Sequence, residues 1–218
     1  MIQGALDQIG AVTREIADTE REGQPARALV ATQTYDAGID DVWDALTNAE
    51  RIPRWFLPIS GDLRLGGRYQ FEGNAGGEIL ECDSPRRLAV TWEYGGQVSW
   101  LTVRLTDPEP GVTTLELEHV AHVDDERWQE FGPGAVGVGW DSGLLGLANH
   151  LRGAGPIDPQ EAMAWLASDE GKEFVTRSSD GWCRASIAAG SDEAEARAAA
   201  DRTTAAYTGA PTPGETAD

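Results

Sequence analysis

The sequence has 218 residues, of which 40% are hydrophobic and 25% are charged, the composition of a globular protein rather than of a disordered chain. It carries 17 basic and 37 acidic residues, and the resulting net charge of −20 repels nucleic-acid phosphates and anionic lipid surfaces. No apolar run approaches the roughly 20 residues of a membrane span, and Met1 to Arg14 lacks the pattern of a signal peptide. Cys82 and Cys183 lie at no redox or zinc spacing. We therefore expect a cytoplasmic protein with reduced thiols and no metal or cofactor, which binds neither nucleic acid nor membrane.

The N-terminal segment is predicted to form a helix over residues 1–27. Apolar side chains recur there at helical spacing, at Ile2, Leu6, Ile9, Val12 and Ile16. The sequence Glu22-Gly23-Gln24-Pro25 is typical of a helix end, so the next element should start near residue 28.

From residue 28 onward the periodicity changes from that of a helix to that of strands. Residues 28–35 predict a strand, and two short helices are expected at 40–46 and about 49–55. Turns rich in Gly, Asn and Pro then separate five strand candidates, at residues 62–71, 77–82, 87–94, 98–106 and 113–123. Helical spacing returns over 136–151, where one apolar stripe is formed by Trp140, Leu144, Leu147 and Leu151.

This order of elements predicts an α+β fold of the helix-grip type over residues 28–153. In such a fold a curved antiparallel sheet wraps around one long helix, and a cavity remains where the helix does not reach the sheet. Residues 154–208 are expected to form a helical extension, since Asp158-Pro159 and two later Ser-Asp-Glu sequences are good helix starts. Residues 209–218 lack periodicity and are predicted to be a disordered tail.

Several short stretches, in this order and spacing, give residues 28–153 a family resemblance. They include Val42-Trp43-Asp44-Ala45-Leu46-Thr47, Glu50-Arg51-Ile52-Pro53-Arg54-Trp55-Phe56, Leu65-Gly66-Gly67-Arg68-Tyr69, Gly77-Glu78-Ile79-Leu80-Glu81, Pro85-Arg86-Arg87-Leu88 and Gly139-Trp140-Asp141. This pattern resembles the START-like SRPBCC superfamily, which has the fold of the birch-pollen allergen, in the subgroup related to the C-terminal domain of the activator of the heat-shock-ninety ATPase. One departure is Gly38, where the family usually has a proline. The helical extension resembles those of actinobacterial members.

The resemblance implies a fold more firmly than a function. Members of the superfamily bind lipids, sterols, polyketides or plant hormones, some cyclise or hydrolyse their ligand, and others are co-chaperones. Fold alone does not choose among these activities.

Strand alternation turns one set of side chains toward the long helix, while Trp100, Thr102 and Arg104 should face outward. The ligand-binding residues predicted on this basis are Trp55, Trp92, Leu101, Val103, Leu117, His119, Trp140 and Leu144. His119 is the one candidate catalytic residue, because a neutral imidazole on an apolar face can bind a ligand carbonyl or act as a general base. The alternative is a half-buried histidine satisfied by a backbone group, since no second catalytic partner is apparent.

Two further features are predicted to carry no chemistry. His119 and His122 are three residues apart on a strand, so they should face opposite sides of the sheet and cannot chelate one metal. Asp141, expected near the start of the long helix, is explained by the helix dipole alone.

Three functions fit these observations. The first is the binding of a small hydrophobic molecule, such as a lipid, polyketide or aromatic metabolite, in the cavity between sheet and helix. The second is an enzyme of the same fold, a polyketide cyclase-like or hydrolase-like protein that uses His119. The third is a protein-interaction module with a chaperone partner. Apolar residues of the extension, including Trp165, Phe174 and Trp182, should dock on the grip domain or on a second subunit of a homodimer.

Overall fold

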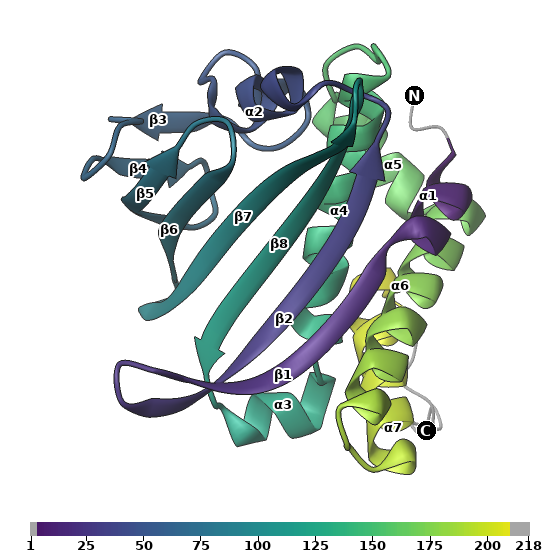
Figure 1. Cartoon of the computed structure of the whole chain (residues 1–218). Helices are drawn as coiled ribbons and strands as arrows, with labels where there is room; N and C mark the ends of the chain where they lie inside the picture. Colours follow the sequence, from purple (N-terminus) through teal and green to yellow (C-terminus); the bar gives the residue numbers. More distant parts are fainter. Residues whose placement is uncertain (1–3, 210–218) are drawn as a thin grey trace.

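The computed structural model describes residues 4–209, which form one large sheet with helices against one face and along one edge (Figure 1). The sheet has eight antiparallel strands in the order β1-β2-β8-β7-β6-β5-β4-β3. The strands are β1 (Thr13–Arg21), β2 (Gln24–Tyr35), β3 (Ile59–Gly61), β4 (Arg68–Phe71), β5 (Gly76–Asp83), β6 (Arg87–Tyr94), β7 (Gln97–Glu109) and β8 (Val112–His122). The curved antiparallel sheet and the long helix behind it confirm the predicted helix-grip α+β fold.

The helix predicted over residues 1–27 is wrong for most of its length. Only α1 (Ala5–Ala11) is helical, and β1 then forms a hairpin with β2. Glu22 and Gly23 both have positive φ, at 54° and 74°, which is the two-residue turn that suits the twist of a hairpin. The apolar spacing misled the prediction because Ile9 packs from the short helix and Ile16 from an edge strand whose other side chains are mostly exposed. Residues 1–3 lie outside the described part of the chain.

The connection between β2 and β5 also differs from the prediction. Helix α2 (Ile39–Thr47) is present, but the second helix is only a 3-10 turn, η1 (Ile52–Arg54), because Pro53 supplies no N–H to continue it. The single strand predicted over 62–71 is wrong, since two short strands, β3 and β4, flank the turn at 62–67.

Helix α4 (Gly134–Leu151) is the long helix of the grip and lies behind the sheet in Figure 1. It follows the short helix α3 (Asp125–Phe131), which is capped by the Asp124 side chain. Five glycines occur within α4, and two of them explain close packing. A Cβ at Gly137 would overlap the Trp182 indole, and a Cβ at Gly146 would overlap the Trp55 carbonyl.

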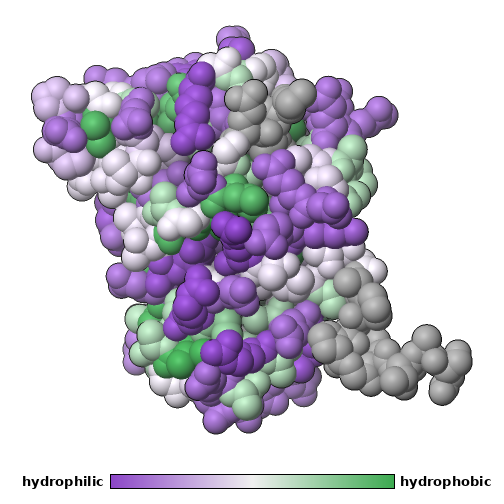
Figure 2. All heavy atoms as spheres, turned by 90° about the vertical axis from the view of Figure 1, so that its right-hand side faces the viewer, coloured by the Kyte–Doolittle hydropathy of each residue, from purple (hydrophilic) through white to green (hydrophobic). Residues whose placement is uncertain are grey.

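The extension consists of α5 (Pro159–Leu166), α6 (Asp169–Ala188) and α7 (Glu193–Thr208), as the capping residues predict. Helix α6 packs on α1, α4, α7 and β1, and its Phe174, Val175 and Trp182 are at most 1% exposed. The extension therefore docks on its own grip domain. Figure 2 shows the side of the molecule that faces right in Figure 1, where hydrophilic residues dominate and apolar residues form scattered patches.

The predicted disordered tail covers Gly209, which ends α7 in a left-handed conformation, and residues 210–218, which lie outside the described part of the chain. Between residues 4 and 209, none of the helices combines the length and the apolar character that crossing a membrane requires.

Candidate functional site

An apolar cavity of about 140 Å³ lies between the sheet and α4. Seven of the residues predicted to bind a ligand line it: Trp55, Trp92, Leu101, Val103, Leu117, Trp140 and Leu144. We call this space the inner cavity. A single water needs only about 10–15 Å³ by this kind of measure, and apolar cavities near 150 Å³ stay dry and accept benzene-sized ligands.

A chain of aromatic rings borders the inner cavity. It runs from Trp55 to Phe56, Phe71, Trp92 and Trp140, with successive ring centroids 5.5, 5.0, 5.8 and 4.8 Å apart. These rings come from segments far apart in the sequence, namely the loop after η1, strands β4 and β6, and helix α4. Trp55 is held in place because its indole N–H donates to the Ala45 carbonyl at 2.9 Å.

Sequence reasoning missed part of this lining. Phe56 was recognised as apolar but not assigned to the site, and Phe71 and Ile79 were left out. The exposed residue Cys82 also lines the inner cavity, which places it at an opening to solvent. No regular alternation marks Ile79, because Leu80 follows it directly and the strand register shifts between Ile79 and Glu81.

A second, wider cavity of about 720 Å³ adjoins the first. We call it the outer cavity. Polar groups line much of it, including Gln97, Ser99, His119, Asp124 and Arg127. His119 therefore belongs to the outer cavity and not to the inner one, where the other seven predicted residues lie.

The wall between the two cavities is formed by two tryptophans and His119. Trp92 lines both cavities, and Trp140 lines the inner one. The Trp140 indole N–H donates to His119 Nδ1 at 3.0 Å, and the two rings meet edge to face at a centroid distance of 5.6 Å. Trp92 and Trp140 are both only half-buried because they border open space. We refer to Trp92, Trp140 and His119 as the partition.

Hydrogen bonds fix the protonation of His119. An indole N–H can only donate, so Nδ1 must be the unprotonated acceptor and Nε2 must carry the proton of the neutral ring. His119 Nε2 then donates to Ser99 Oγ at 2.7 Å, and Ser99 Oγ donates onward to the Trp92 carbonyl at 3.1 Å. Burial lowers the pKa of His119 to about 4, since the 6% exposed ring has little water to stabilise its charge.

This arrangement bears on the enzyme hypothesis. A histidine that activates a serine must accept the hydroxyl proton, whereas His119 donates to Ser99. The expectation of a backbone partner for His119 is wrong, because both ring nitrogens are satisfied by side chains. His119 thus links Trp140 of α4 to Ser99 of β7, and neither of its ring nitrogens is free in this state.

The two neighbouring histidines lie on opposite faces of β8, as the strand spacing predicts. His119 faces α4, while His122 packs edge to face against Trp100 on the outer face, with ring centroids 5.1 Å apart. Over residues 4–209 no group of three or more His, Cys, Asp or Glu side chains is arranged to hold a metal ion.

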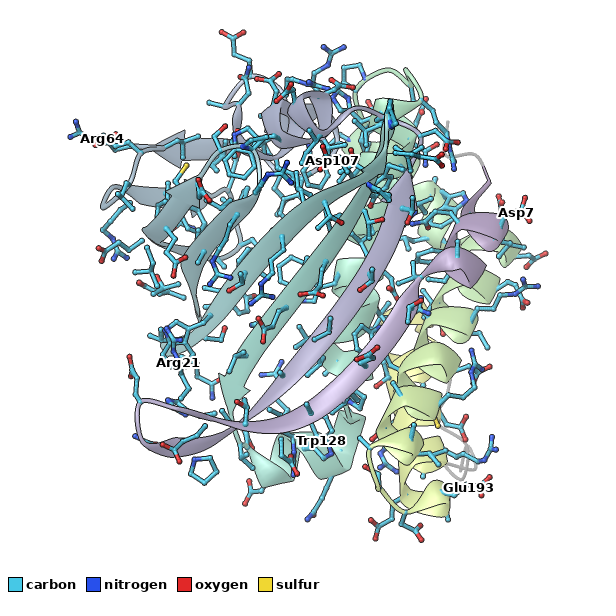
Figure 3. The ribbon with its side chains drawn as sticks, viewed as in Figure 1. Asp7, Arg21, Arg64, Asp107, Trp128 and Glu193 are labelled. Atoms are coloured by element: carbon cyan, nitrogen blue, oxygen red, sulfur yellow. The ribbon has the colours of Figure 1, made fainter. Side chains whose placement is uncertain are left out.

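Trp100 lies on the outer face of the sheet but is only 7% exposed. The end of the β1–β2 hairpin covers it, and the guanidinium of Arg21 stacks on its ring at 4.7 Å. Arg21 and Trp128, which stacks with Arg27, are labelled near this end of the sheet in Figure 3. This cover could not be predicted, because residues of β1 were expected to be helical.

Asp141 is the polar residue whose environment the sequence did not predict. The helix starts earlier than expected, at Gly134, so Asp141 lies well inside it, on the side away from the cavity. Its fully buried carboxylate pairs with Arg14 of β1 at 3.0 Å and accepts hydrogen bonds from Ser178 and Trp182 of α6. Burial raises the pKa of Asp141, while Arg14 and the two hydrogen bonds oppose that rise. We call these four residues the rear anchor.

A curved sheet gripped on one helix, with a cavity between them, defines a START-like SRPBCC-type protein. The chain belongs to the SRPBCC-type family described as activator of Hsp90 ATPase homolog 1-like protein, whose profile matches residues 36–152, more than half of the sequence.

Solved structures extend this similarity. The crystal structure of CalU16 from Micromonospora echinospora is 34% identical, covers 80% of this chain and 98% of CalU16, and has a TM-score of 0.63. The solution structure of CalU16 is 36% identical, covers 82% of this chain and 97% of CalU16, and has a TM-score of 0.66. Because 80% of the chain is longer than residues 36–152, the likeness to CalU16 reaches beyond the family match.

More distant likenesses concern the fold alone. The structure of MLL2253 from Mesorhizobium loti is 22% identical and has a TM-score of 0.51, over 57% of this chain and 96% of that protein. A search among curated proteins finds no significant match.

Proposed function

We propose that this protein binds a small hydrophobic ligand in the inner cavity. The observation that carries the proposal is a void of about 140 Å³ walled by aromatic and aliphatic side chains inside an otherwise well-packed domain. Cavities of this size are uncommon in protein interiors, which are packed as densely as organic crystals. An apolar ligand restores the dispersion contacts that the lining side chains lack.

Two alternatives receive less support. An enzyme that uses His119 as a base needs a free ring nitrogen, and both nitrogens are occupied. A chaperone partner is suggested by the family description, but the apolar residues of α6 are already buried within the chain. A pull-down with the bacterial homologue of the heat-shock-ninety chaperone tests that second alternative directly.

Toluene is the probe that tests the ligand proposal. Its binding is measured by ligand-detected NMR and by the shift in the melting temperature of the protein. The wild-type protein should bind toluene and melt at a higher temperature in its presence, because only the folded state holds the cavity. In Val103→Phe the larger side chain enters the cavity and should abolish binding. Thr102→Phe is the matched control, since Thr102 precedes it on β7 and faces the other side of the sheet. A folded wild-type protein that shows no saturable toluene binding would overturn the proposal.

A further inference from the structure

Trp140 occupies a position that a ligand could take. The indole N–H of Trp140 donates to His119 Nδ1, and the indole ring lines the inner cavity. Should the ring turn aside, Nδ1 would become an unpaired acceptor between the two cavities. A buried acceptor without a donor is costly, so whatever displaces the indole must bring a donor of its own.

We propose that His119 is the polar recognition residue of the ligand site, and that the hydroxyl group of a neutral alcohol or phenol replaces the Trp140 indole N–H at His119 Nδ1. The apolar body of the same ligand fills the inner cavity. This inference rests on the proposed function, and it adds the chemical class of the ligand and the residue that selects it.

The direction of the hydrogen bonds determines why the ligand must donate. His119 Nε2 donates to Ser99, and Ser99 Oγ donates to the Trp92 carbonyl, so moving the proton to Nδ1 would reverse the first bond and break the second. The bond from Ser99 to the Trp92 carbonyl therefore favours Nδ1 as the acceptor after the Trp140 indole leaves. A hydroxyl can donate to it, whereas an ether oxygen or an ionised carboxylate can only accept.

The surrounding charge also favours a neutral ligand. The nearest ring partners of His119 are uncharged, namely Ser99 and Trp140, and the histidine itself is neutral. The charged side chains of the outer cavity are of both signs, including Asp124, Glu126 and Arg127. A carboxylate at Nδ1 would thus lose its hydration without gaining a cation at that atom.

Packing allows the partition to open. Trp140 and Trp92 meet with centroids 4.8 Å apart, yet both remain half-buried because cavity space adjoins them. The Trp140 ring lines the inner cavity, so unfilled space lies directly beside the indole.

The test compares two isomers, benzyl alcohol and the ether anisole, which share their formula, match the size of the inner cavity and differ in whether they carry a donor. By titration calorimetry, wild-type protein should bind the alcohol at least about tenfold more tightly, since the ether leaves Nδ1 unpaired. The NMR resonance of the Trp140 indole N–H, assigned with Trp140→Phe, should shift as the alcohol is added because its hydrogen bond to His119 is lost.

A pair of variants locates the preference. His119→Phe should bind both isomers with affinities within about twofold, because the acceptor is gone. His150→Phe is the matched control and should keep the tenfold preference, since His150 lies near the C-terminal end of α4 and lines neither cavity.

Equal binding of the two isomers by wild-type protein, or alcohol binding that leaves the Trp140 indole resonance in place, would overturn the inference. Toluene binding would still support the proposed function in that case. If neither toluene nor either isomer binds, the proposed function itself fails. The wild-type comparison decides the matter even if His119→Phe does not fold.

Discussion

The two sides of helix α4 are built in opposite ways. Trp140 faces the cavities, where rings are half-buried and about 140 Å³ of the interior is unfilled. Asp141, the next residue, faces the rear anchor, where its carboxylate is fully buried and held by β1 and α6. The front of the helix has room to adapt to a ligand, and the rear fixes where the helix lies.

This contrast suggests what the extension contributes. A cavity removes packing contacts from the front of the helix, so contacts at its rear contribute more to its position. Helix α6 supplies such contacts through Trp182, which packs against Gly137 and donates to Asp141 at 3.1 Å. The extension therefore adds contacts to α4 that do not depend on how the cavity is filled.

The largest effect is expected when the rear anchor is broken. Asp141→Ala should lower the free energy of unfolding by about 3–5 kcal/mol, because it leaves the 6% exposed Arg14 side chain buried without a counter-charge. Urea denaturation measures the loss.

Two controls test the cause of that loss. Glu173→Ala removes an exposed ion pair on α6 and should cost less than about 0.5 kcal/mol. Combining Asp141→Leu with Arg14→Met removes both charges and should recover much of the stability. If the double variant is no more stable than Asp141→Ala, the unpaired charge is not the source of the loss.

The next effect concerns pH and the partition. The unfolded chain protonates His119 near pH 6.5, and the folded protein does so only near pH 4. Between these values the unfolded state binds more protons, so stability must fall as the pH is lowered through this window. The contribution amounts to roughly 3 kcal/mol between pH 6.5 and pH 4.

Chemical denaturation across that pH range, in wild type and in His119→Phe, isolates the contribution of His119 to the free energy of unfolding. The phenylalanine variant should lose less stability than wild type as the pH falls, by up to that amount. Parallel pH profiles for the two proteins would mean that His119 is not held neutral in the folded state.

A third comparison uses two glycines two positions apart on α4. Gly137→Ala should destabilise by about 1–3 kcal/mol, because its Cβ would overlap the Trp182 ring. Gly139→Ala should instead stabilise by up to about 1 kcal/mol, since the site is exposed and alanine favours a helix. Thermal unfolding followed by circular dichroism reports both signs. Similar changes in stability from the two substitutions would contradict the close packing of α4 at Gly137 and its exposure at Gly139.

The sequence predicted the central fold well, and physical reasons explain where it did not. The central part of β7 and most of β8 bury alternate side chains, so their periodicity was informative. Strand β1 lies at an edge with polar side chains, and its turn at Glu22-Gly23 was taken for a helix end. Periodicity says little about a strand that buries almost nothing.

The site shows the same limit. Six of the seven lining residues could be predicted because they repeat along strands and one helix, whereas Trp55 lies in a loop. The bond from Trp140 to His119 and the pair of Arg14 with Asp141, 127 positions apart in the chain, depend on tertiary contacts that no local pattern encodes. Helix-start reasoning placed Asp141 near an N-terminus, so its burial could not be foreseen.

The smallest expected changes in stability compare the packing in front of α4 with the packing behind it. Val103 lines the inner cavity, and Val138 is fully buried behind α4 beside Phe174 and Val175. Changing each valine to leucine adds one methylene, from β7 in front of α4 at Val103 and on the rear side of α4 itself at Val138. Val103→Leu should alter the free energy of unfolding by less than about 1 kcal/mol, because the added group enters empty space and gains contacts there.

Val138→Leu should cost more, about 1–3 kcal/mol, since no space is open around it and neighbouring side chains must leave their preferred rotamers. Guanidinium denaturation of both variants, with toluene titrated into each, measures stability and cavity volume together. Val103→Leu should weaken toluene binding while Val138→Leu leaves it within about twofold. Equal destabilisation by the two substitutions would show that the front of α4 is as tightly packed as the rear, and a packed front leaves no space for a ligand to fill.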